Sequence, residues 1–130
     1  MQIDRREFLA YLTAATVAAI PIGAGPQGVN PMYGLIVKLT IVPGKRDEMI
    51  RVLQESAAGM PGCFSYVVAK DAADENVLWV TEVWDSQASH DASLSLPSVK
   101  EAIPKGKALV SGFDKVAATT PVWGVGLPRQ

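Results

Sequence analysis

The sequence predicts an α+β domain in which helices cover one face of a four-stranded antiparallel sheet. Three observations support this fold class. Apolar residues alternate with polar ones in several short runs, apolar residues at helical spacing lie between these runs, and Gly and Pro mark most of the boundaries. The chain has 130 residues, 48% of them apolar and 19% charged, which allows one core but not two domains. We expect residues 31–130 to form this single domain.

The first strand is expected in the segment YGLIVKLTI, which covers residues 33–41. Leu35, Val37 and Leu39 fall on one face of this strand, and a Pro-Gly pair ends the run. In the next segment, GKRDEMIRVLQESAAGMPG, apolar residues recur every three or four positions with charged residues opposite them. This spacing predicts an amphipathic helix that ends at a second Pro-Gly pair.

Two more strands and a second helical region follow. The segments CFSYVVAK (residues 63–70) and VLWVTEVW (residues 77–84) are rich in β-branched and aromatic residues. The polar residues DAADEN between them predict an antiparallel hairpin with a connection longer than two residues. Residues 86–112 predict a helical region that begins at an N-cap, Ser86, and is interrupted by prolines. A last strand is expected in residues 113–125.

The order of these elements is βαββαβ, the ferredoxin-like split unit. Its two helices cover one face of the sheet, so the other face needs a different cover. The third strand carries apolar residues on both faces, with Leu78 and Val80 opposite Val77 and Trp79. A monomer would expose this apolar surface to water, so we expect a homodimer in which two sheets face each other.

Charge and cysteine content argue against several classes of protein. The formal net charge is −1 and no stretch concentrates Lys and Arg, so we expect no nucleic-acid partner. Cys63 is the single cysteine, which rules out an internal disulfide, and no ligands stand at zinc-site spacing. The glycines of residues 23–28 do not follow a strand, so they do not predict a nucleotide-binding loop. We expect neither a metal nor a cofactor.

The amino terminus, MQIDRREFLAYLTAATVAAIPIGAG, differs in composition from the rest of the chain. Arg5 and Arg6 precede an apolar run over residues 8–20, as in a signal peptide, and the letters RREFL resemble the twin-arginine export motif. This run is shorter than the roughly twenty residues that span a bilayer, so no stable membrane span is expected. We predict that residues 1–30 are a signal peptide and linker, and that the domain is exported to the periplasm. The alternative is a cytoplasmic or membrane-associated protein that keeps an amphipathic helix at this end.

Three segments together resemble the antibiotic biosynthesis monooxygenase family, and within it the quinol monooxygenases. They are VPGKRDEMIRVL, MPGCFSYVV and TEVWDSQASHDASLSLPSVKEA, and the resemblance spans residues 33–122. It implies a dimeric α+β barrel built from ferredoxin-like subunits. It also implies oxygenation of electron-rich phenols or quinols by dioxygen, without metal or flavin.

The resemblance also singles out positions after Trp84 where the family usually has two histidines. In this chain these positions hold Ser93 and Ser98. His90, the single histidine of the sequence, lies one helical turn before Ser93, so it could reach the same pocket. The alternative is that His90 lies on the helix surface beside Asp91.

Oxygenation without a cofactor needs a base that deprotonates the substrate and a pocket that excludes water. His90 is a candidate catalytic residue because it is the one side chain that ordinarily titrates near neutral pH. Glu82 is the second candidate base if burial raises its pKa, and the alternative is a solvated or paired acid. The candidate substrate-binding residues are Trp84, Ser93, Tyr66 and Trp79. The aromatic ones could equally belong to the core.

These observations predict a cofactor-independent monooxygenase that acts on a small aromatic quinol or phenol in the pocket of a dimeric barrel. Its partners would be this molecule, dioxygen and a second copy of the chain. Two alternatives stay open. One is a dimer that binds a small aromatic or lipophilic molecule without turnover, and the other is a structural dimer with a filled barrel.

Overall fold

The structure of the chain is a computed structural model, and it describes residues 31–129. The predicted signal peptide and linker, residues 1–30, lie outside the described residues. Strands and helices follow one another in the predicted order, with the second helical region divided into two helices. The elements are β1 (Tyr33–Ile41), α2 (Arg46–Ser56), β2 (Cys63–Lys70), β3 (Val77–Trp84), α3 (Gln87–Ser93), α4 (Pro97–Leu109) and β4 (Val110–Thr119).

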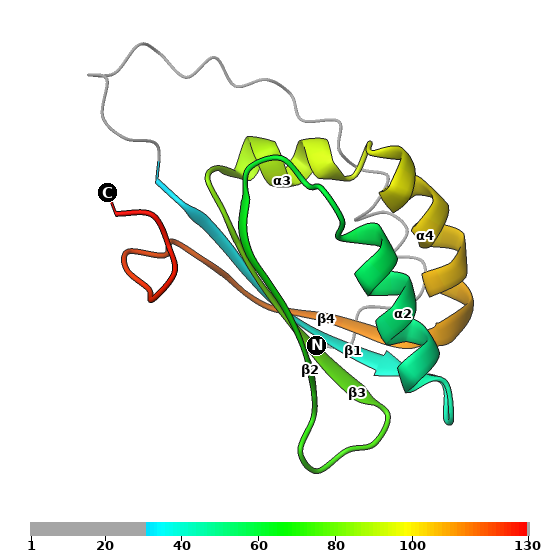
Figure 1. Ribbon diagram of the computed structural model, residues 1–130. Helices are drawn as coiled ribbons and strands as arrows, with labels where there is room; N and C mark the ends of the chain where they lie inside the picture. The colour runs from blue at the N-terminus through cyan, green and yellow to red at the C-terminus, as the bar shows by residue number, and fades with distance from the viewer. Residues whose placement is uncertain (1–30, 130) are drawn as a thin grey trace.

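The four strands form one antiparallel sheet in the order β2-β3-β1-β4. The helices lie on one side of this sheet (Figure 1). Along β1, buried and half-buried residues alternate, because one face of the strand packs under the helices and the other does not. The predicted α+β, ferredoxin-like fold is confirmed.

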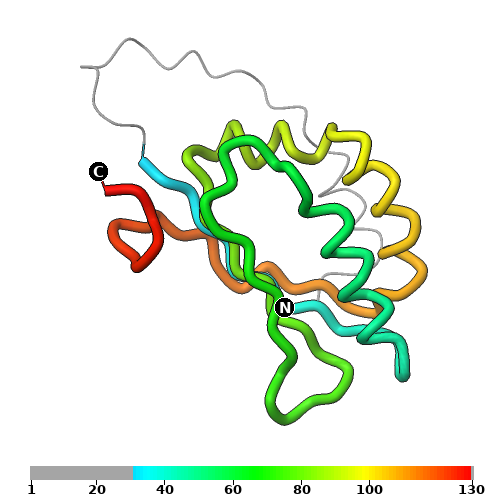
Figure 2. The backbone as a smooth tube through the Cα atoms, in the orientation of Figure 1, coloured from blue at the N-terminus to red at the C-terminus, as the bar shows by residue number. Residues whose placement is uncertain are grey.

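Two element boundaries differ from the sequence prediction. α2 ends at Ser56, before the predicted Pro-Gly stop, because the chain turns through Gly59 with a φ of +69°, which favours glycine. The last strand covers Val110–Thr119, whereas the sequence predicts residues 113–125. Pro121 has no N–H to donate to a neighbouring strand, so the pairing ends before it. The residues that follow leave the sheet beside the start of β1 (Figure 2).

The two prolines of the second helical region act differently. Pro97 is the first residue of α4, where the missing N–H of proline costs no hydrogen bond. Pro104 lies inside α4, and the helix continues through it to Leu109. The region is therefore divided once, between α3 and α4, and not at each proline.

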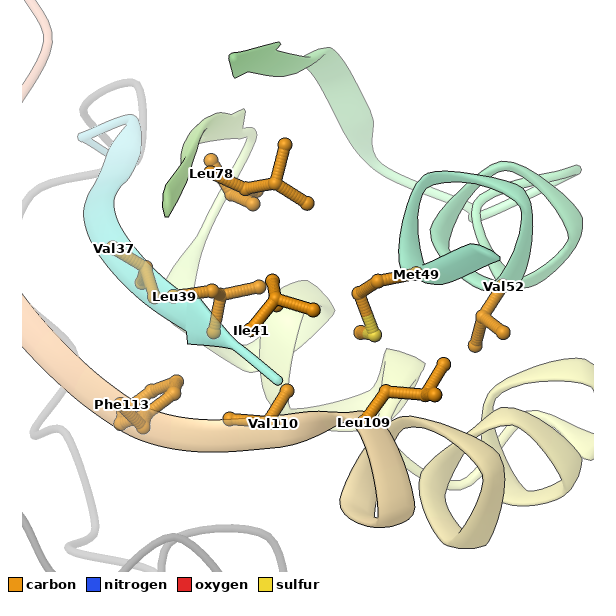
Figure 3. Packing of buried hydrophobic residues seen from close by; sticks show 10 residues of the cluster. Val37, Leu39, Ile41, Met49, Val52, Leu78, Leu109, Val110 and Phe113 are labelled. Carbon is orange, nitrogen blue, oxygen red and sulfur yellow. The ribbon is translucent and has the colours of Figure 1, made fainter. Parts of the chain in front are cut away.

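The core lies between the sheet and the helices α2 and α4. Met49 of α2 points toward Ile41 of β1 and Leu109 of α4 (Figure 3). Burial of each such side chain contributes about 1.5–3 kcal/mol, so the cluster holds the helices on the sheet. The two helices approach closely at Gly106, where an added Cβ would lie 3.2 Å from the Met49 Cε. The buried cluster comprises Val37, Leu39, Ile41, Met49, Val52, Leu78, Val80, Leu109, Val110 and Phe113.

One aspartate organises the connection between β2 and β3. Asp71 Oδ1 accepts hydrogen bonds from the backbone N–H groups of Ala73 and Asp74, at 2.9 and 2.8 Å. Its Oδ2 accepts a third, at 2.7 Å, from the indole Nε1 of Trp79. These bonds, with that of Trp79 as the largest cause, lower the pKa of Asp71 to about 2. The predicted antiparallel hairpin is confirmed, and Asp71 ties its loop to β3.

Several apolar side chains away from the helices are exposed. Val67 on β2 and Val116 on β4 are each 50% exposed. After β4, Val122, Trp123 and Val125 are 84%, 79% and 92% exposed. Clustered exposed apolar side chains commonly mark a contact surface. None of the helices within residues 31–129 has the length and apolar character that crossing a membrane requires.

Candidate functional site

A cavity of about 160 Å³ lies between the sheet and the helices that cover it. Most of its lining side chains are apolar, but Tyr66, Glu82 and His90 also line it. A further polar residue in the wall is Ser56, whose hydroxyl donates to the backbone oxygen of Leu53 at 2.9 Å. A largely apolar cavity with a few polar groups is the usual form of a small-molecule site.

The register of the sheet brings the Glu82 side chain into the cavity wall. Glu82 pairs with Tyr66 on β2 and with Leu35 on β1, so these three side chains share one face. The Glu82 side chain is 12% exposed, and its Oε2 accepts a hydrogen bond from Trp84 Nε1 at 2.8 Å. Burial raises the pKa of Glu82, while the Trp84 hydrogen bond and the nearby His90 act in the opposite direction. This carboxyl can therefore hold a proton at a pH where an exposed glutamate is ionised.

His90 lies beside the same carboxyl, on α3. Ser86 caps this helix with its Oγ, which accepts a hydrogen bond from the Ser89 N–H at 3.1 Å. The His90 side chain is buried, and its Nε2 lies 3.8 Å from Glu82 Oε2. Its other ring nitrogen, Nδ1, lies 3.2 Å from Asp91 Oδ1. The alternative of a histidine on the helix surface is therefore wrong, because His90 lines the cavity.

Two aromatic rings enclose the His90 imidazole. The Trp84 ring meets it edge-on, with centroids 5.4 Å apart and an interplanar angle of 82°. The Tyr33 ring lies at 5.5 Å and 54°. Burial, followed by the charges of Asp91 and Glu82, raises the pKa of the Tyr33 hydroxyl, so it stays protonated near neutral pH. Sequence reasoning missed Tyr33, because only the register that pairs it with Trp84 reveals the contact.

Tyr66 forms another part of the cavity wall. Burial, followed by the charges of Glu82 and Cys63, raises the pKa of its hydroxyl strongly. The hydroxyl is therefore protonated near neutral pH and can donate a hydrogen bond to a ligand or accept one. Tyr66, Glu82 and His90 are the predicted site residues that the fold brings together around the cavity. Their chemical roles stay predictions.

Three other predicted residues lie away from the cavity surface. Trp84 is buried against Glu82 and His90, as described above. Ser93 is also buried, and its Oγ donates to the backbone oxygen of His90 at 2.6 Å. Trp79 lies across the sheet from the Glu82–His90 pair, because its side chain alternates with that of Val80. Contact with a substrate stays a prediction for all three.

The arrangement is suited to the removal of a proton from a bound hydroxyl group. It combines a buried imidazole, a buried carboxyl whose pKa is raised, and a protonated phenol around an apolar space. Within residues 31–129, no three or more His, Cys, Asp and Glu side chains are grouped so that they could hold a metal ion.

The sequence of the chain matches the family model of the antibiotic biosynthesis monooxygenases over residues 32–105. The chain belongs to this family. This confirms the resemblance to the family, although the matched region ends before residue 122, and the likeness to quinol monooxygenases within the family stays a prediction. A solved structure from Chloroflexus aurantiacus, a candidate antibiotic biosynthesis monooxygenase, is 54% identical to this family member, with a TM-score of 0.72. The match covers 75% of this chain and 99% of the other. No curated protein matches the chain.

More distant solved structures share the fold. A candidate monooxygenase from Caulobacter crescentus is 22% identical with a TM-score of 0.64, covering 73% of this chain and 93% of its own. A variant of SnoaB, a cofactor-independent oxygenase from Streptomyces nogalater, is 15% identical with a TM-score of 0.62, covering 73% and 97%. At these identities the likeness shows a common architecture.

Proposed function

We propose that this family member is a cofactor-independent monooxygenase that acts on a small phenol or quinol. The observation that carries the proposal is the Glu82–His90 pair in the wall of an apolar cavity. The pair can take a proton from a hydroxyl group, and the apolar wall keeps water from the anion that forms. Oxygenation without a cofactor is also the activity in the name of SnoaB, which has the same fold.

The size of the cavity favours a substrate with a single aromatic ring. Its volume is about 160 Å³, which is close to that of an engineered apolar cavity of roughly 150 Å³ that binds benzene. A substrate with several fused rings would require the wall to move. A single ring with an acidic hydroxyl would place its oxygen near His90 and its carbon atoms against the apolar lining.

In the proposed reaction the substrate supplies every electron that dioxygen takes up. His90 Nε2 accepts the hydroxyl proton, and the phenolate passes one electron to dioxygen. The resulting superoxide and substrate radical combine through a carbon–oxygen bond. The attacked ring carbon then loses its hydrogen as a proton while the O–O bond breaks, which leaves one oxygen atom on the ring as a carbonyl. The other oxygen leaves as water, with this proton and the proton that His90 returns. A phenol thereby becomes a quinone, and no separate reductant is needed.

Oxygen uptake tests this proposal directly. The full chain should consume dioxygen with one-ring hydroquinones and much more slowly with fused-ring ones. His90→Ala should lower kcat by about 10²–10⁴, the usual effect of losing a general base. Gln87→Ala, a change at an exposed position of the same helix, should keep the activity of the unchanged chain. Equal turnover in all three proteins would contradict a catalytic role for His90.

The same substitution should also lower stability. His90 is buried against Trp84 and Tyr33, so removal of its ring should lower the free energy of unfolding by about 1–3 kcal/mol. Thermal unfolding of His90→Ala and Gln87→Ala measures this difference. A folded His90→Ala protein is the condition for interpreting its kcat.

The second candidate function is binding of a small aromatic molecule without turnover. The observation that favours it is Ser93, whose hydroxyl is directed to the His90 backbone oxygen where the family usually has a histidine. In that case one-ring phenols should raise the unfolding temperature, and none of them should cause oxygen uptake. A thermal shift accompanied by turnover would exclude this candidate.

We propose that the outer face of the sheet and the residues after β4 pack against a second copy of the chain. Val67, Val116 and Trp123 expose enough apolar surface in the single chain to favour such a contact. Two copies related by a two-fold axis would cover each other with the same surface. The resulting homodimer would be the proposed α+β barrel.

We also propose export by the twin-arginine route, on the basis of Arg5 and Arg6 before the apolar run. Replacing both residues by Lys keeps their charge but removes the planar guanidinium groups. The substituted chain should therefore stay in the cytoplasm, which fractionation of the expressing cells would measure. Periplasmic recovery equal to that of the unchanged chain would contradict this route.

A further inference from the structure

The His90 imidazole lies between two carboxylates, one at each ring nitrogen. Asp91 Oδ1 is 3.2 Å from Nδ1, within hydrogen-bond distance. Glu82 Oε2 is 3.8 Å from Nε2, which is too long for a direct hydrogen bond. The two ring nitrogens therefore differ: Nδ1 has a hydrogen-bond partner in Asp91, and Nε2 has none in Glu82.

This difference determines which nitrogen of the neutral ring carries the proton. A carboxylate can only accept, so the contact with Asp91 is a hydrogen bond only if Nδ1 carries hydrogen. In a neutral imidazole the proton on Nδ1 leaves Nε2 with a free lone pair. The structure assigns to Asp91 the role of a positioning residue, which keeps His90 protonated at Nδ1 and directs the unprotonated Nε2 toward the cavity. The effect of Asp91 on turnover rests on the proposed function. The assignment of the His90 tautomer does not.

The surroundings of the ring prevent it from turning to exchange its nitrogens. Trp84 meets the ring at 82° on one side and Tyr33 approaches it at 54°. Ser93 fixes the backbone of the same helical turn through its bond to the His90 oxygen. Rotation of the imidazole would need these groups to move, so Asp91 and Glu82 keep their separate nitrogens.

The groups that can exchange protons or interact by charge with His90 come from three elements. Tyr33 on β1 is neutral near pH 7, as an ordinary tyrosine is, and burial raises the pKa of its hydroxyl further. Glu82 on β3 is largely buried, and Asp91 on α3 is 29% exposed. When Nε2 accepts a proton, the imidazolium gains the attraction of Asp91 at its other nitrogen. Asp91 therefore favours the neutral His90 tautomer that can accept a proton at Nε2. It also stabilises the imidazolium that forms when the proton is taken up.

The single histidine of the chain allows this inference to be tested by NMR. The full chain, made without a histidine tag and labelled with ¹⁵N in the imidazole, should give one pair of ring signals. In the neutral ring, Nδ1 should carry the proton. Asp91→Ala should move the proton to Nε2 in a large part of the population, because Nδ1 then loses its hydrogen-bond acceptor.

Asp91→Asn tests whether the tautomer depends on a group that can only accept a hydrogen bond. The asparagine amide can accept from Nδ1 through its oxygen or donate to it through its NH₂ group, so the fraction of His90 protonated at Nδ1 should fall. Glu101→Gln, at an exposed position of α4, makes the corresponding change on another helix and should leave the tautomer unchanged. Circular dichroism of each variant verifies that it is folded.

The kinetic expectation follows from the tautomer. Asp91→Ala should lower kcat at least about tenfold, as for other groups that orient a histidine, and Asp91→Asn should lower it as well, because its amide no longer selects the Nδ1–H tautomer. An Nε2–H tautomer in the unchanged chain, or an unchanged tautomer in Asp91→Ala, would overturn the inference. The expected tautomers without oxygen uptake in the unchanged chain would overturn the proposed oxygenation and leave the role of Asp91 standing.

Discussion

At the scale of single residues, the proton affinity of the site follows from how Glu82 is enclosed. Trp84 donates one hydrogen bond to the carboxyl, and His90 lies 3.8 Å away. These two groups favour the ionised form, yet burial outweighs them and raises the pKa. A glutamate on the exposed face of the same strand would be fully ionised near neutral pH. The pKa of this carboxyl is therefore determined by the face of the sheet on which Glu82 lies.

Comparison with Glu82→Gln should show how the raised pKa of Glu82 makes the free energy of unfolding depend on pH. The folded-state pKa of Glu82 lies above its ordinary value of 4.5, so its contribution to stability is complete below that value. The contribution is lost as pH rises through the folded-state pKa. Urea unfolding from about pH 4 to pH 8 should therefore show the unchanged chain losing free energy of unfolding relative to Glu82→Gln. Glu101→Gln is the control, and if all three proteins follow parallel curves, Glu82 has no raised pKa.

At the scale of elements, α3 is the part that turns a sheet face into a site. It is a short helix capped by Ser86, and the side chain of its Ser89 lies against Gly62, in the turn before β2. The Gly62 carbonyl oxygen accepts a hydrogen bond from the Asp85 N–H at 2.9 Å, which ties this turn to the end of β3. Gly62 has a φ of +80°, and an added Cβ would lie 2.7 Å from the Ser89 Cβ and 2.8 Å from an Asp85 oxygen. The position of His90 therefore depends on a glycine far from it in sequence.

Gly62→Ala should displace α3 and lower stability, and the chain contains a matched control. Gly44 has nearly the same φ, +79°, but no atom lies within 4 Å of its added Cβ. Gly44→Ala should thus cost only the conformational strain of about 1–2 kcal/mol, and Gly62→Ala a further 1–3 kcal/mol or so from overpacking. Chemical unfolding measures both. If both variants lose the same free energy of unfolding, the turn that contains Gly62 accepts the extra carbon atom without overpacking.

The helix α3 also shows where sequence reasoning ends. The strands were predictable, because their apolar residues alternate wherever one face is buried. In α3, QASHDAS, the buried residues are His90 and Ser93, so no apolar stripe indicates which face points inward. The register shift between Cys63 and Ser65 likewise leaves no sign in the sequence. The cavity and the contact of Tyr33 with His90 arise only when the elements are packed together.

At the scale of the whole molecule, the two faces of the sheet serve different purposes. The covered face contains the core and the cavity, and the outer face carries half-exposed apolar side chains such as Val67. The proposed homodimer uses the second face and leaves the first within each copy. Association would then support the site from behind the sheet, without filling the cavity.

Val67→Asp should weaken this association and leave the fold of the single chain intact. Val67 is already 50% exposed, so in a monomer the charge would face water at little cost. Between two sheets the same charge would be buried without a partner, at a cost of several kcal/mol. Light scattering at micromolar concentration should show a dimer for the unchanged chain and a monomer for the variant. Val42→Asp, at the exposed residue that follows β1, is the control and should stay dimeric; a monomeric unchanged chain would contradict the proposal.

The hydrogen bonds of Asp71 have a consequence for the tolerance of the molecule to acid. An aspartate that supports a turn ordinarily loses its charge near pH 3.8, but this one keeps it down to about pH 2. Its contribution is present above pH 3.8 and is lost only as pH falls through about 2. The strands that carry Tyr66 and Glu82 therefore remain fastened at the end farther from His90 in acid that already protonates Glu82, whose pKa is raised. Acidification should remove the charge of the Glu82 carboxyl well before it loosens the hairpin, so a loss of activity that accompanies this change would be reversible.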